Sequence, residues 1–343
     1  MAREREKQMF LKWFDRYALF VSIVVGAIGF PVFRHLTPLL PTMIFFMLFF
    51  TFCKVNPLDL RLHKWHIIAL TVQLCLAIGV YYLLLWLGRR CPLISHPLIA
   101  QSAMLCFLMP TATAAPIIAG KLGGSIQNLT TFTLISNLAT AVVVPVFFPL
   151  VHTVEGMTFC MASWLILRRV GPLLLGPFLS AWLLRLVWNY AHRKEGGEFV
   201  LPTRMSQWPF YLWVGTIVIL MGQIVNTLVN EPLDGVALAG MVIGAGVSCA
   251  VQFMLGWYIG EHFPAGSHGA DYQDVVINPA AAPKTKAGIS RLTAGQALGQ
   301  KNTTLAIWMA QTYLLPLTAI GPAAYMVVQN LFNSYQLWRM RTR

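Results

Sequence analysis

Ten hydrophobic runs, each about long enough to cross a lipid bilayer, constrain the fold of this chain more than any other feature. A hydrocarbon core of about 30 Å takes roughly 20 apolar residues of helix. Hydrophobic residues make up 57% of the 343 positions and charged residues 11%, whereas a soluble domain is about one quarter charged. We therefore predict an integral, all-α membrane protein with ten transmembrane helices. The runs lie near 17–33, 36–53, 66–88, 98–120, 126–151, 162–188, 208–229, 233–260, 291–313 and 316–338.

The positions of Lys and Arg predict the orientation. If the runs alternate in direction, Arg34, Arg89, Arg90, Arg168 and Arg169 lie on one side of the membrane. With Lys301 set aside, the other nineteen of the 25 Lys and Arg lie on the side of both termini. Basic loops favour the cytoplasm, so we expect cytoplasmic termini, and we expect the membrane to be a bacterial inner membrane. The excess of Lys and Arg in the predicted cytoplasmic loops thus explains the net charge of +13. No nucleic acid is expected as a partner.

Shorter features complete the outline. The charged residues 1–12 lead into the first run without a small-residue cleavage site, which predicts a retained helix. The stretch 152–165 could hold a short interfacial helix, and the polar segment 261–290 predicts a solvated loop between two halves of a repeat. Gly240-Met-Val-Ile-Gly244 predicts a small-residue packing seam. The six cysteines have no metal-binding spacing, so buried thiols and no cofactor are expected.

Two of the runs are interrupted. Run 98–120 contains Pro110-Thr-Ala-Thr-Ala-Ala-Pro116, and proline both removes a backbone donor and clashes with the preceding turn. Run 291–313 contains Gly295-Gln-Ala-Leu-Gly299 followed by Gln-Lys-Asn302. Each is the fourth run of its half, which predicts two inverted five-helix repeats whose discontinuous helices 4 and 9 cross. Interrupted segments at matching positions mark the binding site of a transporter.

Lys301 is the one ionisable side chain expected at mid-membrane. All twelve carboxylates fall in termini, loops or the ends of runs. A lysine at the bilayer centre costs at least about 2.5–3.5 kcal/mol on insertion scales, so it is a functional candidate. The alternative is a lysine that reaches the interface, which its place beside the helix break makes difficult.

Several motifs share an order and spacing: Phe45-Phe-Met-Leu-Phe-Phe-Thr-Phe-Cys53, Leu58-Asp-Leu-Arg61, Gln73, Leu298-Gly-Gln-Lys-Asn-Thr-Thr-Leu-Ala306, Pro316, Pro322 and Gln329-Asn330. Together they resemble the bile acid:sodium symporter family, within a wider group that includes arsenite and auxin carriers. The resemblance covers nearly the whole chain, as a divergent member. It implies a panel domain (spans 1, 2, 6 and 7; about 15–53 and 162–229) and a core domain (spans 3–5 and 8–10; about 66–151 and 233–338). It also implies alternating access and an organic anion as substrate, from a bile-acid-like steroid to a small carboxylate.

The chain departs from this family at the cation ligands. The family's crossover glutamate falls on Ala297, and the glutamine of its Gln-Asn pair falls on Lys301. The family's Gly-Gly-x-x-Ser-Asn falls on Thr111, Ala112, Ala115 and Pro116, which leaves Gln73 and Thr133 as cation ligands. Hard cations need several oxygen ligands, so poor sodium binding is predicted. We expect the Lys301 ammonium to occupy the place of the cation, solvated by Gln73 and backbone carbonyls.

The predicted residues for substrate or ion binding are Lys301, Gln73, Asn302, Thr111, Thr113, Gln300, Gln296, Thr133 and Asn330. Asn302 matches the family asparagine that faces the substrate cavity, and Thr111 and Thr113 offer hydroxyls. Lys301 is either a fixed charge in a uniporter or exchanger, or its protonation replaces sodium as the coupled event. In both cases it would attract an anion, helped by the positive ends of the half-helices.

The predicted function is therefore secondary transport of an organic anion, independent of sodium and without enzymatic activity. Three alternatives remain open: a sodium-coupled symporter with degenerate sites, a non-transporting channel or sensor, and a membrane-embedded enzyme. The enzyme would need a pair of carboxylates or a metal triad near the interface, and the sequence has no Asp-x-x-Asp or clustered His.

Overall fold

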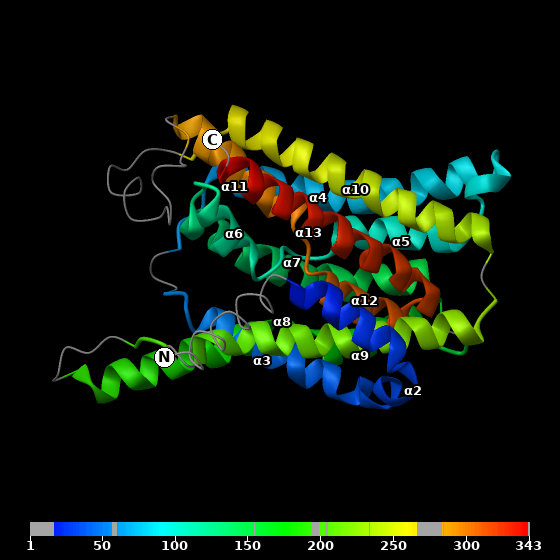
Figure 1. Cartoon of the computed structure of the whole chain (residues 1–343), viewed down its shortest axis with the longest axis horizontal. Coiled ribbons are helices and arrows are strands. Elements are labelled where there is room, and N and C mark those ends of the chain that lie inside the picture. Colours follow the sequence, from blue (N-terminus) through cyan, green and yellow to red (C-terminus); the bar gives the residue numbers. More distant parts are fainter. Residues whose placement is uncertain are drawn as a thin grey trace, which may run out of the picture.

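The computed structural model describes residues 17–56, 60–153, 155–193, 199–202, 205–232, 234–265, 283 and 285–341, and all regular elements in these ranges are helices (Figure 1). After a first helix, Tyr17–Ile28, the α-helices are α2 (Phe30–Phe33), α3 (Leu40–Phe52), α4 (Lys64–Gly88), α5 (Pro97–Leu108), α6 (Ala115–Lys121), α7 (Ile126–Val151), α8 (Phe159–Ala191), α9 (Trp208–Asn230), α10 (Gly235–His262), α11 (Lys286–Gly299), α12 (Thr303–Tyr313) and α13 (Ile320–Arg341). Short 3-10 turns connect some of them: η1 (Arg34–Leu39), η3 (Pro92–Ile94), η5 (Met205–Gln207) and η7 (Pro316–Ala319).

Each of the ten hydrophobic runs falls on helical residues, and six described helices are long and apolar enough to cross a membrane. These six are the continuous stretch Phe30–Phe52 and the helices α4, α7, α8, α9 and α10. Two of the remaining runs are divided into the short pairs α5/α6 and α11/α12. The chain is therefore an all-helical protein suited to a membrane, while the ten-span inverted repeat stays a prediction.

The helices form two groups in space. α3 packs against α8 and α9, and α2 and η1 also pack against α9. α10 packs against α5, α11 and α13, and α4 packs against α5. Figure 1 shows the first group as the lower layer and the second as the upper layer. α12 contacts helices of both groups, so it lies where the two layers meet.

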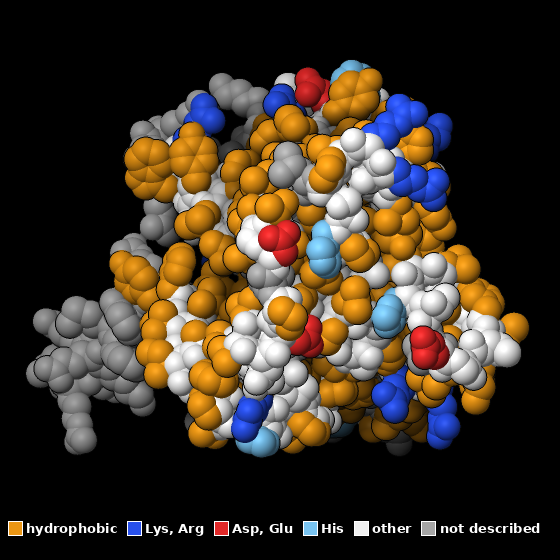
Figure 2. Space-filling view, turned by 90° about the vertical axis from the view of Figure 1, so that its right-hand side faces the viewer, with side chains coloured by type: hydrophobic (Ala, Val, Ile, Leu, Met, Phe, Trp, Pro, Cys, Tyr) orange, Lys and Arg blue, Asp and Glu red, His pale blue; other side chains and the backbone are white. Residues whose placement is uncertain are grey.

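Large apolar side chains cover the outward faces of the long helices. On α10, Ile243 is 66% exposed, Val247 58% and Met254 54%. Contiguous exposed apolar surface of this kind is rare on a soluble monomer, and it matches the hydrocarbon of a bilayer. Figure 2 shows one end of the molecule, where acidic, basic and histidine side chains are scattered among hydrophobic ones. Charges at the helix ends and apolar sides between them are the arrangement expected of a membrane protein.

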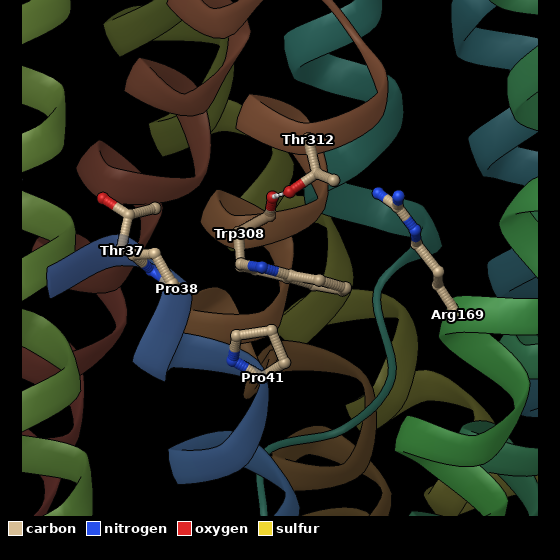
Figure 3. A pocket seen from close by; sticks show the side chains of 6 residues that line it. All are labelled: Thr37, Pro38, Pro41, Arg169, Trp308 and Thr312. Carbon is tan, nitrogen blue, oxygen red and sulfur yellow. Dashed lines mark hydrogen bonds between the residues drawn. The ribbon is translucent and has the colours of Figure 1, made fainter. Parts of the chain in front are cut away.

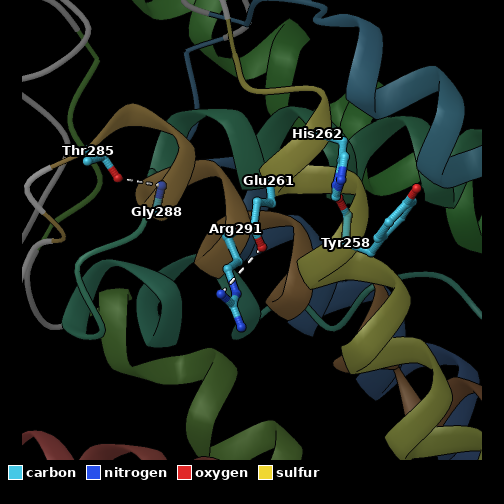
Figure 4. A network of polar contacts seen from close by, with 6 residues as sticks. All are labelled: Tyr258, Glu261, His262, Thr285, Gly288 and Arg291. Carbon is cyan, nitrogen blue, oxygen red and sulfur yellow. Dashed lines mark hydrogen bonds and ion pairs between the residues drawn. The ribbon is translucent and has the colours of Figure 1, made fainter.

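Side-chain caps account for the starting points of several helices. The hydroxyls of Ser125 and Thr158 accept hydrogen bonds from backbone N–H groups in the first turns of α7 and α8. The Thr285 hydroxyl accepts from Gly288 at the start of α11 (Figure 4). These bonds satisfy donors that the first helical turn leaves free. In the same view, the guanidinium of Arg291 pairs with the carboxylate of Glu261 at 3.4 Å and joins α11 to the end of α10.

Two expectations about connecting segments were wrong. The polar segment 261–290 is not all loop, since α10 continues to His262 and α11 begins at Lys286; residues 266–282 and 284 lie outside the described residues. The stretch 152–165 holds no separate interfacial helix, because α8 already begins at Phe159. The N-terminal residues 1–16 and part of the Leu58–Arg61 motif also lie outside the described ranges.

The tight helix seam is at a different glycine pair from the one predicted. A Cβ built on Gly244 would have no atom within 4 Å, so the Gly240–Gly244 motif is not a two-glycine seam. At Gly256 a Cβ would lie 2.3 Å from the Ala294 carbonyl oxygen, and at Gly260 it would lie 2.2 Å from that of Ser290. These two glycines therefore allow the backbones of α10 and α11 to touch. This contact sets the position of α11, which leads into the interrupted segment.

Candidate functional site

The two predicted helix breaks are present and meet inside the protein. α5 ends at Leu108 and Met109 takes an extended conformation, before α6 begins at Ala115. α11 ends at Gly299, and Gln300 is likewise extended before α12 begins at Thr303. Four helix ends thus converge at one place, which we call the crossing (residues 109–114 and 300–302).

Backbone hydrogen bonds join the two segments of the crossing. The N–H of Ala112 donates to the Gln300 carbonyl at 2.9 Å, and the N–H of Asn302 donates to the Pro110 carbonyl at 2.8 Å. They form an isolated antiparallel bridge between the two segments. Unwound backbone at membrane depth must be satisfied within the protein, and each segment here satisfies the other.

Thr111 and Lys301 are the two residues paired in this bridge. The Thr111 hydroxyl donates to the carbonyl of Ala297 at 2.7 Å, and the Thr111 N–H donates to the Ser136 hydroxyl of α7 at 3.1 Å. Thr111 is completely buried. In this conformation its hydroxyl is therefore bonded within the protein and is not presented to a solute.

Lys301 is buried within the protein, with a side chain only 2% exposed. Its backbone is held by the Gln329 amide of α13, which accepts from the Lys301 N–H at 2.9 Å and donates to its carbonyl at 3.2 Å. The Nζ atom has no hydrogen-bond partner among the described residues. Its electrostatic neighbour is the thiol of Cys106 on α5. The crossing therefore encloses a lysine amine beside a thiol, with no described carboxylate bonded to it.

Gln73 of α4 reaches the crossing but does not solvate the lysine. Its Nε2 donates to the carbonyls of Leu108 and Met109 at 3.3 and 3.1 Å, and its Oε1 has no partner within the described ranges. These are carbonyls that the end of α5 leaves free. Gln73 thus caps the first broken helix, and the expected bond to the Lys301 ammonium is not present.

Gln296 and Gln300 belong to a row of amides between α11 and α13. The Gln300 Nε2 donates to Gln296 Oε1 and also, at 3.1 Å, to the Asn333 side chain. The Gln296 Nε2 donates to the Gln336 side chain at 2.7 Å. Asn333 and Gln336 were missed at the sequence level, although both lie on the polar face of the last run.

The remaining predicted residues have different positions. Asn302 caps α12, since its Oδ1 accepts from the Leu305 N–H at 3.2 Å, and its Nδ2 has no partner in the described part of the chain. Thr113 is half-buried in the turn before α6. The side chains of Thr133 and Asn330 each donate to a carbonyl of their own helix, at 2.9 and 2.7 Å. The structure therefore brings Thr111, Lys301, Asn302, Gln73, Gln296 and Gln300 together.

Two further residues form hydrogen bonds to the backbone at the crossing, and neither was predicted from the sequence. The Tyr325 hydroxyl of α13 donates to the Gly299 carbonyl at 2.8 Å. The Gln252 amide of α10 donates to the Tyr325 oxygen and to the Cys106 carbonyl, both at 3.0 Å. A glutamine in the middle of an apolar run was the signal that could have identified Gln252. Together with Gln73, these residues occupy carbonyls at the ends of both broken helices.

A separate cavity lies where the two layers meet. It has a volume of about 460 Å³ and is lined by Thr37, Pro38, Pro41, Arg169, Trp308 and Thr312. Figure 3 shows the Trp308 ring in its centre, with Pro41 on one side and Arg169 of α8 beside the ring. The Thr312 hydroxyl donates to the Trp308 carbonyl at 2.7 Å. None of the predicted binding residues lines this cavity, and Arg169 had been counted among the charges that flank the spans.

The crossing and the cavity are connected through α12. This helix begins at Thr303, directly after the crossing, and carries Trp308 and Thr312. At 1.5 Å per residue, Trp308 lies about 7.5 Å further along the axis. One helix therefore connects the crossing to a wall of the cavity. Among the described residues, no three His, Cys, Asp or Glu side chains are grouped closely enough to hold a metal ion.

Comparison with known proteins assigns no family. No model of a known family matches the chain, and no curated protein is similar to it. The class that the structure defines is therefore an all-helical protein with membrane-length apolar helices and two paired helix breaks.

Proposed function

We propose that this protein is a secondary transporter of an organic anion, which works by alternating access and does not depend on sodium. The observation that carries the proposal is the pairing of Thr111 with Lys301, where two interrupted helices cross inside the protein. Crossed, discontinuous helices form the substrate and ion sites of many secondary transporters. Buried polar backbone of this kind is otherwise rare at membrane depth.

The arrangement of helices supports a ten-span inverted repeat with a panel and a core. The breaks fall in the fourth and ninth hydrophobic runs, which are equivalent positions of two five-helix halves. The layer of α3, α8 and α9 corresponds to the panel, and the layer of α4, α5, α10, α11 and α13 corresponds to the core. In this proposal the two layers move against each other along α12 and expose the cavity to alternate sides.

Sodium independence is supported by the kinds of oxygen atom that lie at the crossing and by their hydrogen bonds. Where the bile acid:sodium symporter family has a bridging glutamate, this chain has Ala297, and its carbonyl accepts the Thr111 hydroxyl. The amides of Gln73 and Gln252 and the hydroxyl of Tyr325 bond to other carbonyls at the helix ends. The side-chain oxygens of Gln73 and Gln252 have no hydrogen-bond partner among the described residues. A hard cation takes several oxygen ligands, usually with a carboxylate among them, so two amide oxygens are a poor set for sodium.

Lys301 offers two modes of coupling. As a permanent charge it would replace the cation and make the protein a uniporter or exchanger. If it gains and loses a proton during the cycle, a proton gradient would drive transport. Its amine without a partner is compatible with both, and a bacterial inner membrane with cytoplasmic termini would supply the gradient.

Uptake into proteoliposomes tests the proposal. Carboxylates and sulfonates are first screened by thermal shift, because a bound ligand raises apparent stability. Uptake of the best ligand is then measured with sodium, pH and membrane potential varied one at a time. We expect uptake without sodium, and a loss of any pH-gradient dependence in Lys301→Gln.

Three results would count against the proposal. Absence of uptake for all ligands that bind would contradict transport. Strict dependence on sodium would favour a symporter with degenerate cation sites instead. A pH-dependent uptake that Lys301→Gln leaves unchanged would remove Lys301 from the coupling.

A further inference from the structure

We infer that Arg169 and Trp308 recognise the transported anion, and that the substrate is a ring-bearing organic acid whose acid group binds the Arg169 guanidinium. This inference rests on the proposed function and names the residues that select its substrate. It also moves the anion site away from Lys301, which the sequence had favoured.

The first argument is access. Lys301 is 2% exposed and does not line the cavity, whereas the exposed Arg169 side chain does. A solute in the cavity therefore meets the guanidinium and not the buried amine. Arginine binds planar acid groups through two parallel hydrogen bonds, which makes it well suited to a carboxylate or sulfonate.

The second argument is charge balance. No ion pair of Arg169 with a carboxylate is found among the described residues. The neighbour of Arg169 is the hydroxyl of Tyr313, a neutral group of α12. Arg169 lies ten residues after the start of α8, about 15 Å along the helix, so it is well inside the helical layer. A cation in this position without an acidic partner is compensated when an anionic solute enters.

The third argument is the shape and chemistry of the lining. Trp308 lies between Pro41 and the Arg169 guanidinium, and Pro38 adds to the apolar wall (Figure 3). Trp308 is only 6% exposed, so it forms the apolar floor of the cavity, while the proline rings supply apolar surface against which a hydrophobic ring can pack. The hydroxyls of Thr37 and Thr312 complete the lining. A volume of about 460 Å³ lies within the usual range of about 300–1,000 Å³ for small-molecule sites.

Binding to the purified protein tests the inference with matched probes. Each ring acid is compared with its neutral primary amide: 2-naphthoate with 2-naphthamide, indole-3-acetate with indole-3-acetamide, and cholate with cholamide. Acetate serves as an acid without a ring. Affinities are measured by calorimetric titration for the wild type, Arg169→Gln, Arg169→Lys and Arg168→Gln.

We expect Arg169→Gln to weaken binding of the acids by about 10- to 100-fold, since a charge-assisted hydrogen bond is lost. Binding of the amides should change by less than about 3-fold, which is under 1 kcal/mol. Arg169→Lys should give an intermediate affinity for the acids. Arg168→Gln is the control, because the neighbouring Arg168 does not line the cavity, and it should leave every affinity unchanged.

Four outcomes would overturn the inference. In the first, the wild type binds none of the ring acids. In the second and third, Arg169→Gln weakens acid and amide binding equally, or leaves acid binding unchanged. In the fourth, acetate binds to the wild type as tightly as 2-naphthoate. Binding needs no transport, so the two proposals can fail separately. Arg169-dependent binding without uptake would refute transport alone, whereas uptake with a KM unaffected by Arg169→Gln would refute this inference alone.

Discussion

The crossing and the cavity each contain a basic side chain, and the surroundings of the two residues are opposite. At the crossing, Lys301 is buried and the nearby carbonyls are bonded to the chain's own amides and hydroxyls. In the cavity, Arg169 is exposed and lies beside an aromatic ring. A positive charge near a helix break is therefore not by itself a binding group. Access decides which of the two cations a solute in the cavity can meet.

The comparison predicts that the residues of the crossing support the fold, whereas the residues of the cavity serve the proposed ligand binding. Substitutions at the crossing should mainly change stability, because they disturb bonds and packing inside the protein. Substitutions in the cavity should leave the ligand-free protein as stable as before. Thermal unfolding of the purified protein without ligand tests this contrast.

The largest effect is expected where α10 touches α11. In Gly256→Leu the new Cβ would lie 2.3 Å from the Ala294 carbonyl oxygen and 2.7 Å from the Gly295 Cα, both of which are backbone atoms. Overpacking costs about 1–3 kcal/mol and more when backbone must move. We expect a large fall in Tm or no folded protein. Gly244→Leu, on the same helix with no atom within 4 Å of the new Cβ, is the control, and equal behaviour of the two variants would contradict the seam.

The next effect is a gain of stability from Lys301→Met. The substitution keeps a long, unbranched side chain and removes an amine that has no hydrogen-bond partner among the described residues. Burying an unpaired polar group is unfavourable in either protonation state, so we expect Tm to rise by about 2 °C or more. Lys121→Met, at an exposed lysine of α6, should change Tm little. A fall in Tm for Lys301→Met would mean that the amine is stabilised by its surroundings.

A smaller loss is expected for Thr111→Val. The shape of the side chain is kept, but the Ala297 carbonyl loses the hydroxyl that donates to it at 2.7 Å. An unsatisfied buried acceptor costs about 1–3 kcal/mol, and a fall in Tm of a few degrees should follow. Thr113→Val is the matched control in the same break, because Thr113 is only half-buried. If both variants unfold at the same temperature, the Thr111 bond does not hold the crossing.

The smallest effect on stability is expected for Arg169→Gln without ligand. Its guanidinium is exposed in the cavity, and exposed substitutions usually change stability by no more than about 0.5 kcal/mol. The Tm should therefore stay within about 1 °C of the wild type. A clear fall would show that Arg169 supports the fold, and the contrast between the two regions would then be lost.

The sequence located both breaks and most of the helices. The first two runs are divided differently, because the predicted gap at 34–35 lies inside the continuous stretch Phe30–Phe52, which follows the shorter helix Tyr17–Ile28. α5 ends shortly before Pro110 and α11 ends at Gly299, so local chemistry at these two residues predicts the breaks. Gly295 lies inside α11, and Pro116 lies in the first turn of α6.

Lys301 could be recognised because it is an isolated charge within a span. The matching positions of the two breaks predicted that they would meet. The pairing of Thr111 with Lys301 was not predicted, since no local pattern links residues 190 positions apart.

Side-chain direction was less predictable. Successive residues of an α-helix point in directions about 100° apart, so Gln329 and the predicted Asn330 lie on different faces of α13. Gln329 bonds to Lys301, while Asn330 bonds to its own helix. The position of Arg169 at the cavity was not predicted either. The sequence placed it among the charges that flank the spans, whereas its exposed side chain lines the cavity between the layers.

The backbone pairing at the crossing has a consequence for how such a site can change over time. Ala112 and Asn302 hold the two segments together through main-chain amides, which every residue except proline provides. Neighbouring side chains can therefore be exchanged while the geometry of the break persists. A cation-binding shell could be lost, and a lysine gained, without rebuilding the scaffold. In the proposed transporter, the chemistry of ion coupling and the architecture of the break would therefore be adjustable separately.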